Sequence, residues 1–332
     1  MCWTVIGEGL RAWKRRLSLC DVKNGVVPEK SIVLAQDLLL DWYRRHGRKH
    51  LPWRSTRDPY KIVVSEVMLA QTQVERVLPK FETFVRQFPT FAALAGAPKA
   101  DVLRAWRGLG YNSRAVRLRA LAMHVTGQYG GTLPRDGAAL RRLPGVGAYT
   151  VAAIRAFAYG EDDAALDTNV RRIVHRVFNG IEIPARVSAH ELNRQAARFM
   201  PAGRAHDWNS ALMDLGSIIC TARAPKCLIC PLLSVCIAAP LEASKLDEAR
   251  KQLAAKASRP QQAFKKSTRF VRGRLIDRLR ELPEGQKVSL LDLQSELRVQ
   301  CGELLYDVEA IIEALRKDGM VKREIDGVAL AD

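Results

Sequence analysis

The sequence predicts an all-α fold up to about residue 240, followed by a small separate α+β domain over 269–332. Before residue 240, apolar side chains recur at helical spacing in one segment after another, and the alternating pattern of strands is almost absent. Between 241 and 268 the composition shifts to Ala, Lys, Gln and Ser, which is typical of a linker or a loosely packed helix.

The length and charge favour a two-domain protein with a polyanionic partner. A chain of 332 residues can bury about two cores. Its 53 Lys and Arg exceed its 35 Asp and Glu, a net charge of +18, which favours nucleic acid. No apolar run has the length of a transmembrane helix, and we expect no membrane partner. Residues 1–30 lack a secretion signal, and we expect either a disordered basic arm or an upstream start codon.

The first predicted helices begin at capping residues. Ser31 is expected to cap a helix over 32–46, and Asp58-Pro59 to begin the next. Pro79 is expected near the start of a third helix. One or two helices over 92–109 are expected to end at glycines.

Further helices are expected over 113–129, 148–159, 188–200 and 209–220. Gly130-Gly131 is expected to end the first of these, and Ser188 to cap the third. Beyond the linker, three amphipathic segments precede a two-stranded hairpin with a turn at Asp326-Gly327. This order resembles a winged helix, a fold used for DNA binding and for protein contacts. A small packing or partner domain is the alternative.

The stretch 143–172 combines a glycine turn, a predicted helix and a loop carboxylate. Leu143-Pro144-Gly145-Val146-Gly147 predicts a tight turn before a helix, with backbone N–H groups free to hold a phosphate. Asp167 follows, just ahead of Arg171-Arg172, which we interpret as a grip on DNA phosphate. A loop carboxylate beside such a grip indicates chemistry rather than binding alone.

Four cysteines lie in one compact segment, with six, two and five residues between successive members: Cys220, Cys227, Cys230 and Cys236. Two separated Cys pairs are usual for zinc, whereas four thiolates in one loop favour a [4Fe–4S] cluster. Zinc, or reduced cysteines without metal, are the alternatives. Arg223 and Lys226 lie in the first interval, where a cluster would stiffen a basic loop against phosphate.

Glu66 is a single carboxylate within the apolar run 64–69. If it is desolvated, it can hold a proton near neutral pH and act as a general acid. The pattern alone favours the alternative, a glutamate on the exposed side of an amphipathic helix.

Several motifs together resemble one enzyme family. LPGVG at 143–147 and L-D-x-N-V-x-R at 166–172 are similar to helix-hairpin-helix DNA glycosylases of the endonuclease III and MutY branch. The cysteine spacing matches that branch. SEVMLxQTQV at 65–74 resembles the MutY-type adenine DNA glycosylases, as do LPWR at 51–54, DPYK at 58–61 and GLGY at 108–111.

The resemblance covers residues 31–240 and implies a two-lobed fold. One lobe would be a helical barrel over 51–161 with the helix-hairpin-helix. The other would hold the cluster and comprise 31–50 and 162–240.

The resemblance also implies roles for individual residues. Glu66 would protonate the departing adenine, and Asp167, supported by Asn169, would stabilise the cationic sugar. Tyr149 stands where bifunctional relatives carry a Schiff-base lysine, so we expect no strand cleavage. The implied DNA contacts are Gly145, Val146, Gly147, Gln71, Thr72, Tyr111, Arg54, Arg171, Arg223 and Lys226. The implied base pocket contains Trp53, Arg54 and Asp214.

The sequence departs from the family's pattern at several places. Ala70 replaces a glutamine, Asn112 a tyrosine, and Asp214 a glutamate. A Nudix-like C-terminal domain, usual in the family, is expected to be missing. Thymine or uracil opposite guanine is therefore the alternative substrate to adenine opposite guanine or 8-oxoguanine. A non-enzymatic Fe–S DNA-binding regulator is the distant alternative. We expect a cytoplasmic, nucleoid-associated monomer that binds mismatched or damaged double-stranded DNA.

Overall fold

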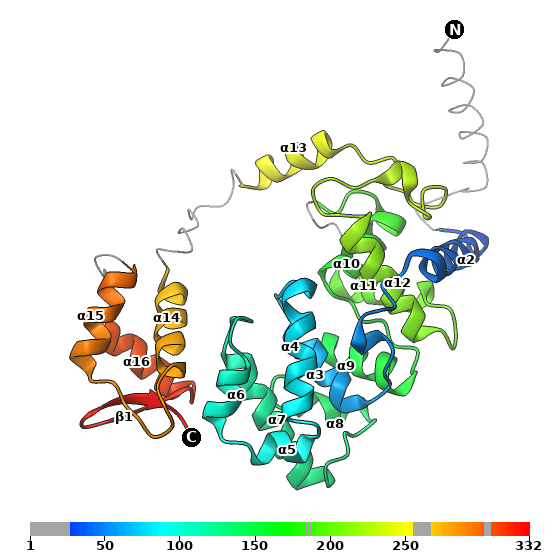
Figure 1. Ribbon diagram of the computed structural model, residues 1–332. Helices are drawn as coiled ribbons and strands as arrows, with labels where there is room; N and C mark the ends of the chain where they lie inside the picture. The colour runs from blue at the N-terminus through cyan, green and yellow to red at the C-terminus, as the bar shows by residue number, and fades with distance from the viewer. Residues whose placement is uncertain (1–26, 184, 186, 255–266, 302–306) are drawn as a thin grey trace. The chain divides into compact units, whose positions relative to one another are not determined.

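The computed structural model describes residues 27–183, 185, 187–254, 267–301 and 307–332. The basic arm predicted over 1–30 and the linker predicted over 241–268 thus lie partly outside the described residues. These residues form two compact units, one from 27–57 with 148–254 and one from 58–147 with 267–332 (Figure 1). The domain boundaries drawn from the sequence remain a prediction.

The first unit contains helices and loops and, within its described residues, no strand. Its elements are α2 (Glu29–His46), η3 (Pro52–Arg54), α9 (Ala148–Ile154), the π-helical turn η4 (Arg155–Tyr159), α10 (Thr168–Asn179), α11 (Ala189–Phe199), α12 (Ala205–Ile218), η5 (Cys227–Ile229) and α13 (Ala243–Ala254). Phe199 is central to the core, with ring centroids 5.1 Å from Phe178 and 4.8 Å from Trp208. This core joins α10, α11 and α12, so it fixes the helix that follows Asp167.

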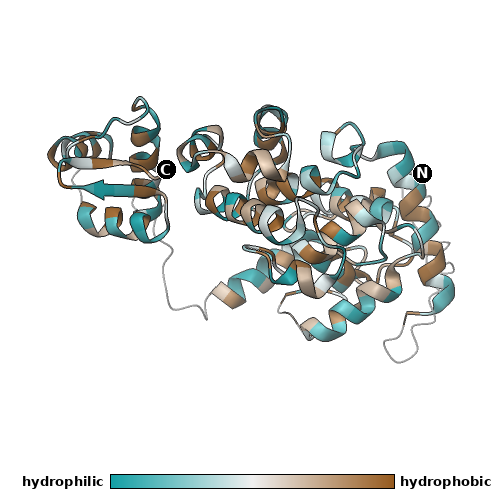
Figure 2. Ribbon diagram, turned by 90° about the horizontal axis from the view of Figure 1, so that it is seen from below, coloured by the Kyte–Doolittle hydropathy of each residue, from teal (hydrophilic) through white to brown (hydrophobic). Residues whose placement is uncertain are grey.

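The second unit combines six helices of the middle of the chain with the C-terminal segment. Its elements are α3 (Pro59–Leu69), α4 (Val74–Gln87), α5 (Phe91–Gly96), α6 (Lys99–Ala105), α7 (Ser113–Tyr129), α8 (Gly137–Arg141), α14 (Thr268–Arg280), α15 (Leu290–Cys301), α16 (Val308–Lys317), β1 (Val321–Glu324) and β2 (Gly327–Leu330). The helices carry hydrophobic and hydrophilic stretches side by side (Figure 2). On α4 the buried side chains are Val77, Phe81 and Phe84, one helical face.

The C-terminal segment has the predicted three helices and antiparallel hairpin. Val321 pairs with Leu330 and Glu324 with Gly327, so the two-residue turn is Ile325-Asp326, one position before the predicted one. A further bridge joins Val288 to Val328. Its identity as a winged helix remains a prediction.

Several predicted helix ends are confirmed by their hydrogen bonds. Asp58 caps α3 by accepting from Tyr60 N, and Ser188 caps α11 by accepting from Glu191 N. Gly130 ends α7 in the left-handed conformation. None of the helices in the described part of the chain is long and apolar enough to cross a membrane.

Two predicted boundaries are wrong. Ser31 does not cap α2, because that helix begins at Glu29 after Pro28 and Ser31 lies in its first turn. Pro79 lies inside α4, which begins at Val74. The favoured place for proline is the first turn of a helix, but packing of the apolar face of α4 outweighs one lost backbone hydrogen bond.

Candidate active site

The N-terminus of α10 holds Asp167 in a fixed position. Its Oδ1 accepts from Val170 N at 2.7 Å and its Oδ2 from Asn169 Nδ2 at 3.2 Å. Buried Asn209 fixes the preceding segment by accepting from Ala165 N at 2.8 Å. Burial raises the pKa of the Asp167 carboxyl, while the hydrogen bonds from Val170 and Asn169 lower it.

Asn169 is positioned from two sides. The Arg172 guanidinium donates to Asn169 Oδ1 at 2.8 Å, so the amide nitrogen of Asn169 is directed to Asp167. Gly216 of α12 packs directly against Asn169, because a Cβ on this glycine would lie 2.6 Å from Asn169 Cβ. The glycine thus allows α12 to approach α10 closely.

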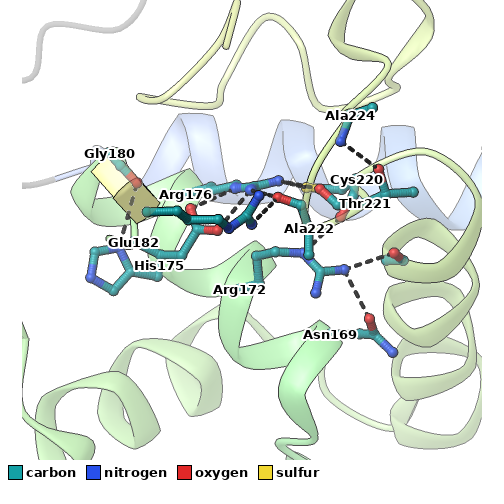
Figure 3. Close-up of polar contacts among 12 residues, drawn as sticks. Asn169, Arg172, His175, Arg176, Gly180, Glu182, Cys220, Thr221, Ala222 and Ala224 are labelled. Atoms are coloured by element: carbon teal, nitrogen blue, oxygen red, sulfur yellow. Dashed lines mark hydrogen bonds and ion pairs between the residues drawn. The ribbon is translucent and has the colours of Figure 1, made fainter. Parts of the chain in front are cut away.

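Arg172 connects this centre to the cysteine segment (Figure 3). Its guanidinium also donates to the carbonyl oxygens of Gly216 and Cys220, at 2.7 and 2.8 Å. The residue is only 9% exposed. The interpretation of Arg171-Arg172 as a phosphate-binding pair is therefore wrong for Arg172, because its guanidinium makes hydrogen bonds inside the protein. Arg171 is partly exposed.

One turn further along α10, Arg176 is also buried. It pairs with Glu182 Oε1 at 2.7 Å and donates to Cys220 Sγ at 3.4 Å and Thr221 O at 2.9 Å (Figure 3). Two arginines one turn apart therefore attach α10 to the backbone and sulfur of Cys220.

The four cysteines line one small cavity of about 20 Å³ with Arg176, Ile219 and Leu241 among its other walls. Burial raises the pKa values of Cys230 and Cys236 to about 12, so without a metal these thiols are neutral. Within the described residues, no three Cys, His or carboxylate side chains stand in a preformed metal-binding arrangement.

The donor set nevertheless fits an iron–sulfur cluster. All four thiols share one cavity, and two of the sulfurs accept N–H groups: Cys220 from Arg176, and Cys227 from Leu241 N at 3.4 Å. N–H donors of this kind stabilise thiolate ligands. In the same segment Arg223 and Lys226 are exposed.

Of the three residues predicted for the base pocket, Trp53 and Asp214 are buried in the first unit, and the side chain of Arg54 is 7% exposed. Asp214 is 0% exposed and accepts from Arg48 N at 2.8 Å and from the Arg48 guanidinium at 2.9 and 2.8 Å. Arg54 lies 3.6 Å from Asp214 Oδ1, donates to Ser210 Oγ, and stacks over Phe157. Trp53 is likewise buried. Asp214 and Arg54 therefore form an ion pair inside the protein instead of facing solvent.

Glu66 is buried in α3 of the second unit, at 9% exposure. The alternative of an exposed glutamate is therefore wrong. Glu66 is buried because α3 is enclosed on most of its faces. Val63, Val64 and Met68 of the same helix are fully buried as well.

Gln71 and Tyr111 share an unusual backbone conformation. Their φ angles are +61° and +46°, and among the described residues they are the two non-glycine positions with positive φ. Such strain of order 1–3 kcal/mol persists where the surroundings enforce it, often at functional sites. Tyr111 is 42% exposed, so a strained backbone presents this ring to solvent.

Arg114 enforces both conformations and was missed in the sequence. Its guanidinium donates to Ala70 O and Thr72 Oγ1 on one loop, at 2.6 and 2.9 Å, and to Leu109 O and Gly110 O on the other, both at 3.0 Å. Burial lowers the pKa of Arg114 to about 10. In the sequence it is one of several arginines of a basic helix, with no signal of its own.

The glycine turn has the predicted conformation at its first glycine. Gly145 has a φ of +77°, and a Cβ there would lie 3.3 Å from Arg117 Cβ. Val146 is buried and Gly147 partly exposed. Tyr149 is partly exposed in the first turn of α9.

Comparison with known proteins identifies relatives of this fold. The model of the HhH-GPD superfamily base excision DNA repair proteins matches residues 64–198. An adenine DNA glycosylase of Mycolicibacterium smegmatis is 39% identical over 293 residues, 87% of this chain and 93% of the relative. A thymine/uracil-DNA glycosylase of Methanothermobacter thermautotrophicus is 34% identical over 209 residues, 63% and 94% of the two chains. The solved structure of a thermostable thymine-DNA glycosylase has a TM-score of 0.59 at 32% identity, covering 65% of this chain and 98% of that one.

Proposed function

Because the chain belongs to the helix-hairpin-helix DNA glycosylases of the adenine DNA glycosylase type, we propose that it removes adenine mispaired with guanine or 8-oxoguanine. It is a base excision repair enzyme that hydrolyses N-glycosidic bonds in DNA. The alternative of a non-enzymatic regulator is set aside on the same grounds.

The extent of the match carries the choice of adenine. The adenine DNA glycosylase relative matches 87% of this chain, whereas the thymine/uracil-DNA glycosylase relative matches 63%. Thymine or uracil opposite guanine is accordingly the less favoured substrate.

Asp167 stabilises the positive charge that develops on the sugar as the base departs. Its carboxylate is already aligned by Val170 and Asn169, so no reorganisation is needed during the reaction. Arg172 acts through Asn169 and is a positioning residue.

Glu66 supplies the proton that adenine needs to leave as a neutral base. Its burial among apolar side chains of α3 supports this role, because a general acid acts most effectively where bulk water is excluded. Tyr149 offers no amine to the opened sugar, so the enzyme leaves the abasic strand intact.

Trp53, Arg54 and Asp214 support the base pocket from behind. Asp214 is buried and pairs with both Arg48 and Arg54, so we assign Trp53, Arg54 and Asp214 to stabilising the wall of the pocket. Arg54 is not expected to contact a DNA phosphate directly, because its side chain is only 7% exposed.

Cys220, Cys227, Cys230 and Cys236 would hold a [4Fe–4S] cluster, which supplies a rigid support for the basic loop when bound. Arg223 and Lys226, with Arg171 and the turn of Gly145, Val146 and Gly147, would contact DNA phosphates. Gln71, Thr72 and Tyr111 would contact the base opposite the excised one. We propose a cytoplasmic monomer.

A panel of mismatched duplexes tests the substrate. Duplexes with adenine opposite 8-oxoguanine or guanine, and with thymine or uracil opposite guanine, are incubated with the enzyme and then treated with alkali. Alkali-labile sites on the adenine strand are expected. Strand breaks only at thymine or uracil would contradict the proposal, and breaks before alkali would contradict the role of Tyr149.

A further inference from the structure

The N-terminal helix of the C-terminal segment, α14, forms one wall of a groove in the second unit. The groove has a volume of about 770 Å³. Its other wall is formed by the two strained loops, 71–73 and 108–113, which carry Gln71 and Tyr111.

Arg280 at the end of α14 anchors that helix against the loops. It is 8% exposed and donates to Leu103 O at 2.8 Å, to Asn112 Oδ1 at 2.7 Å and to Asp277 Oδ1 at 2.7 Å. A buried guanidinium is costly unless its donors are satisfied, so these bonds fix the position of α14. Asn112, which stands where the family has a tyrosine, is thereby explained as an acceptor for Arg280.

Arg269 at the other end of α14 reaches the strained loop directly. Its guanidinium lies 5.0 Å from the centroid of the Tyr111 ring and donates to the Tyr111 hydroxyl. Arg114 lies 5.6 Å from the same ring. Tyr111 is therefore held between an arginine of α7 and one of α14.

The groove is strongly basic. Arg76, Arg269 and Arg274 line it with exposed side chains. Arg272 also lines it and pairs with Asp318, while Asp277 is its one acidic lining residue within the described part of the chain. Excess arginine facing a polar groove favours a polyphosphate backbone over an apolar peptide.

We propose that this groove binds the backbone of the DNA strand that carries the base opposite the excised one. Through Arg280 and Arg269, α14 is then the element that fixes the Tyr111 loop toward that strand. The C-terminal segment thus acts on the opposite base through Tyr111, in addition to adding charge. The inference rests on the proposed function, because that function supplies the DNA duplex.

Charge-neutral variants of the full-length protein test the groove. Arg269→Gln and Arg274→Gln are compared with Arg316→Gln, which removes an exposed arginine of α16 that does not line the groove. Binding of a duplex with a tetrahydrofuran abasic analogue opposite 8-oxoguanine is measured at several salt concentrations.

Each groove variant is expected to weaken binding about fivefold and to lower the salt slope by about 0.9, the effect of one phosphate contact. Arg316→Gln is expected to change neither. If both groove variants bind with the wild-type Kd and slope, the groove does not hold DNA. An acidic protein partner would then be the remaining class of ligand.

Photocrosslinking identifies which DNA strand lies in the groove. Iodouracil is placed on one strand at a time, either within two nucleotides of the abasic analogue or within two nucleotides of the opposite base. Crosslinks to residues 268–280 are expected from the opposite-base strand, and crosslinks only from the analogue strand would overturn the proposal. Asn112→Ala and Arg280→Met, which remove either partner of the anchor, are expected to reduce these crosslinks at least fivefold, with folding checked by circular dichroism.

Base release by the wild type is measured in parallel. Absence of release from every duplex would contradict the proposed function, whereas the binding and crosslinking results decide on the groove separately.

Discussion

Asp167 has two roles, one structural and one chemical, that a single substitution can separate. It caps α10 through Val170 N, and its charge is assigned to the sugar. Asparagine caps helices as well as aspartate but carries no charge. Asp167→Asn is therefore expected to bind duplex normally and to lose base release by about 10³-fold or more, measured in single turnover. Asp307→Asn, which alters the cap of α16 in the same way, is expected to keep wild-type rates.

The raised pKa of Asp167 predicts the pH dependence of stability. Burial, its largest cause, favours the protonated carboxyl in the folded protein. The resulting stabilisation is present below the ordinary value of 3.8 and is lost as pH rises through the raised value. Asp167→Asn is accordingly expected to be more resistant to urea than wild type at pH 7, with the difference vanishing near pH 3.8. A variant less stable than wild type at pH 7 would contradict the burial argument.

At the scale of elements, the close approach of α10 and α12 depends on Gly216. A Cβ there must displace Asn169, since the two would be 2.6 Å apart. Gly216→Ala is expected to lower base release at least tenfold, because Asn169 aligns Asp167. Gly127→Ala in α7 meets no atom within 4 Å and is the matched control. It is expected to keep full activity and to gain about 0.5–1 kcal/mol of stability. Equal activity of both variants would argue against positioning by Asn169.

The cysteine segment is the second element whose composition can be measured. Four thiols on one cavity predict about four irons per chain and a brown protein. Cys236→Ser is expected to lose the iron and to loosen the exposed segment that carries Arg223 and Lys226, seen as faster proteolysis there. Stoichiometric zinc in protein purified without oxygen would contradict the assignment.

At the scale of the whole molecule, local chemistry made most helices predictable from the sequence. Asp58 and Ser188 were identified as caps, and Gly130 as a helix end, because these roles depend on neighbouring backbone groups alone. Pro79 was misplaced, because tertiary packing of α4 decides where that helix begins.

The residues that connect distant segments could not be predicted in this way. Arg114, Arg172 and Arg280 look like ordinary basic surface residues in the sequence, and Arg172 was assigned to DNA. Each instead donates to carbonyl or amide oxygens, which lie between 3 and 177 positions away in the chain, and only the fold brings these partners together. The motifs predict which residues carry the chemistry, whereas only the fold shows which arginines position them.

The most direct test of the central claim is the identity of the base that the enzyme frees. Wild type and Glu66→Gln are incubated with duplexes containing adenine opposite 8-oxoguanine or thymine opposite guanine, and the free bases are identified by mass spectrometry. Free adenine from wild type, at least 100-fold less from Glu66→Gln, and little thymine from either are expected. Free thymine released at equal rates by both proteins would contradict both the substrate and the role of Glu66.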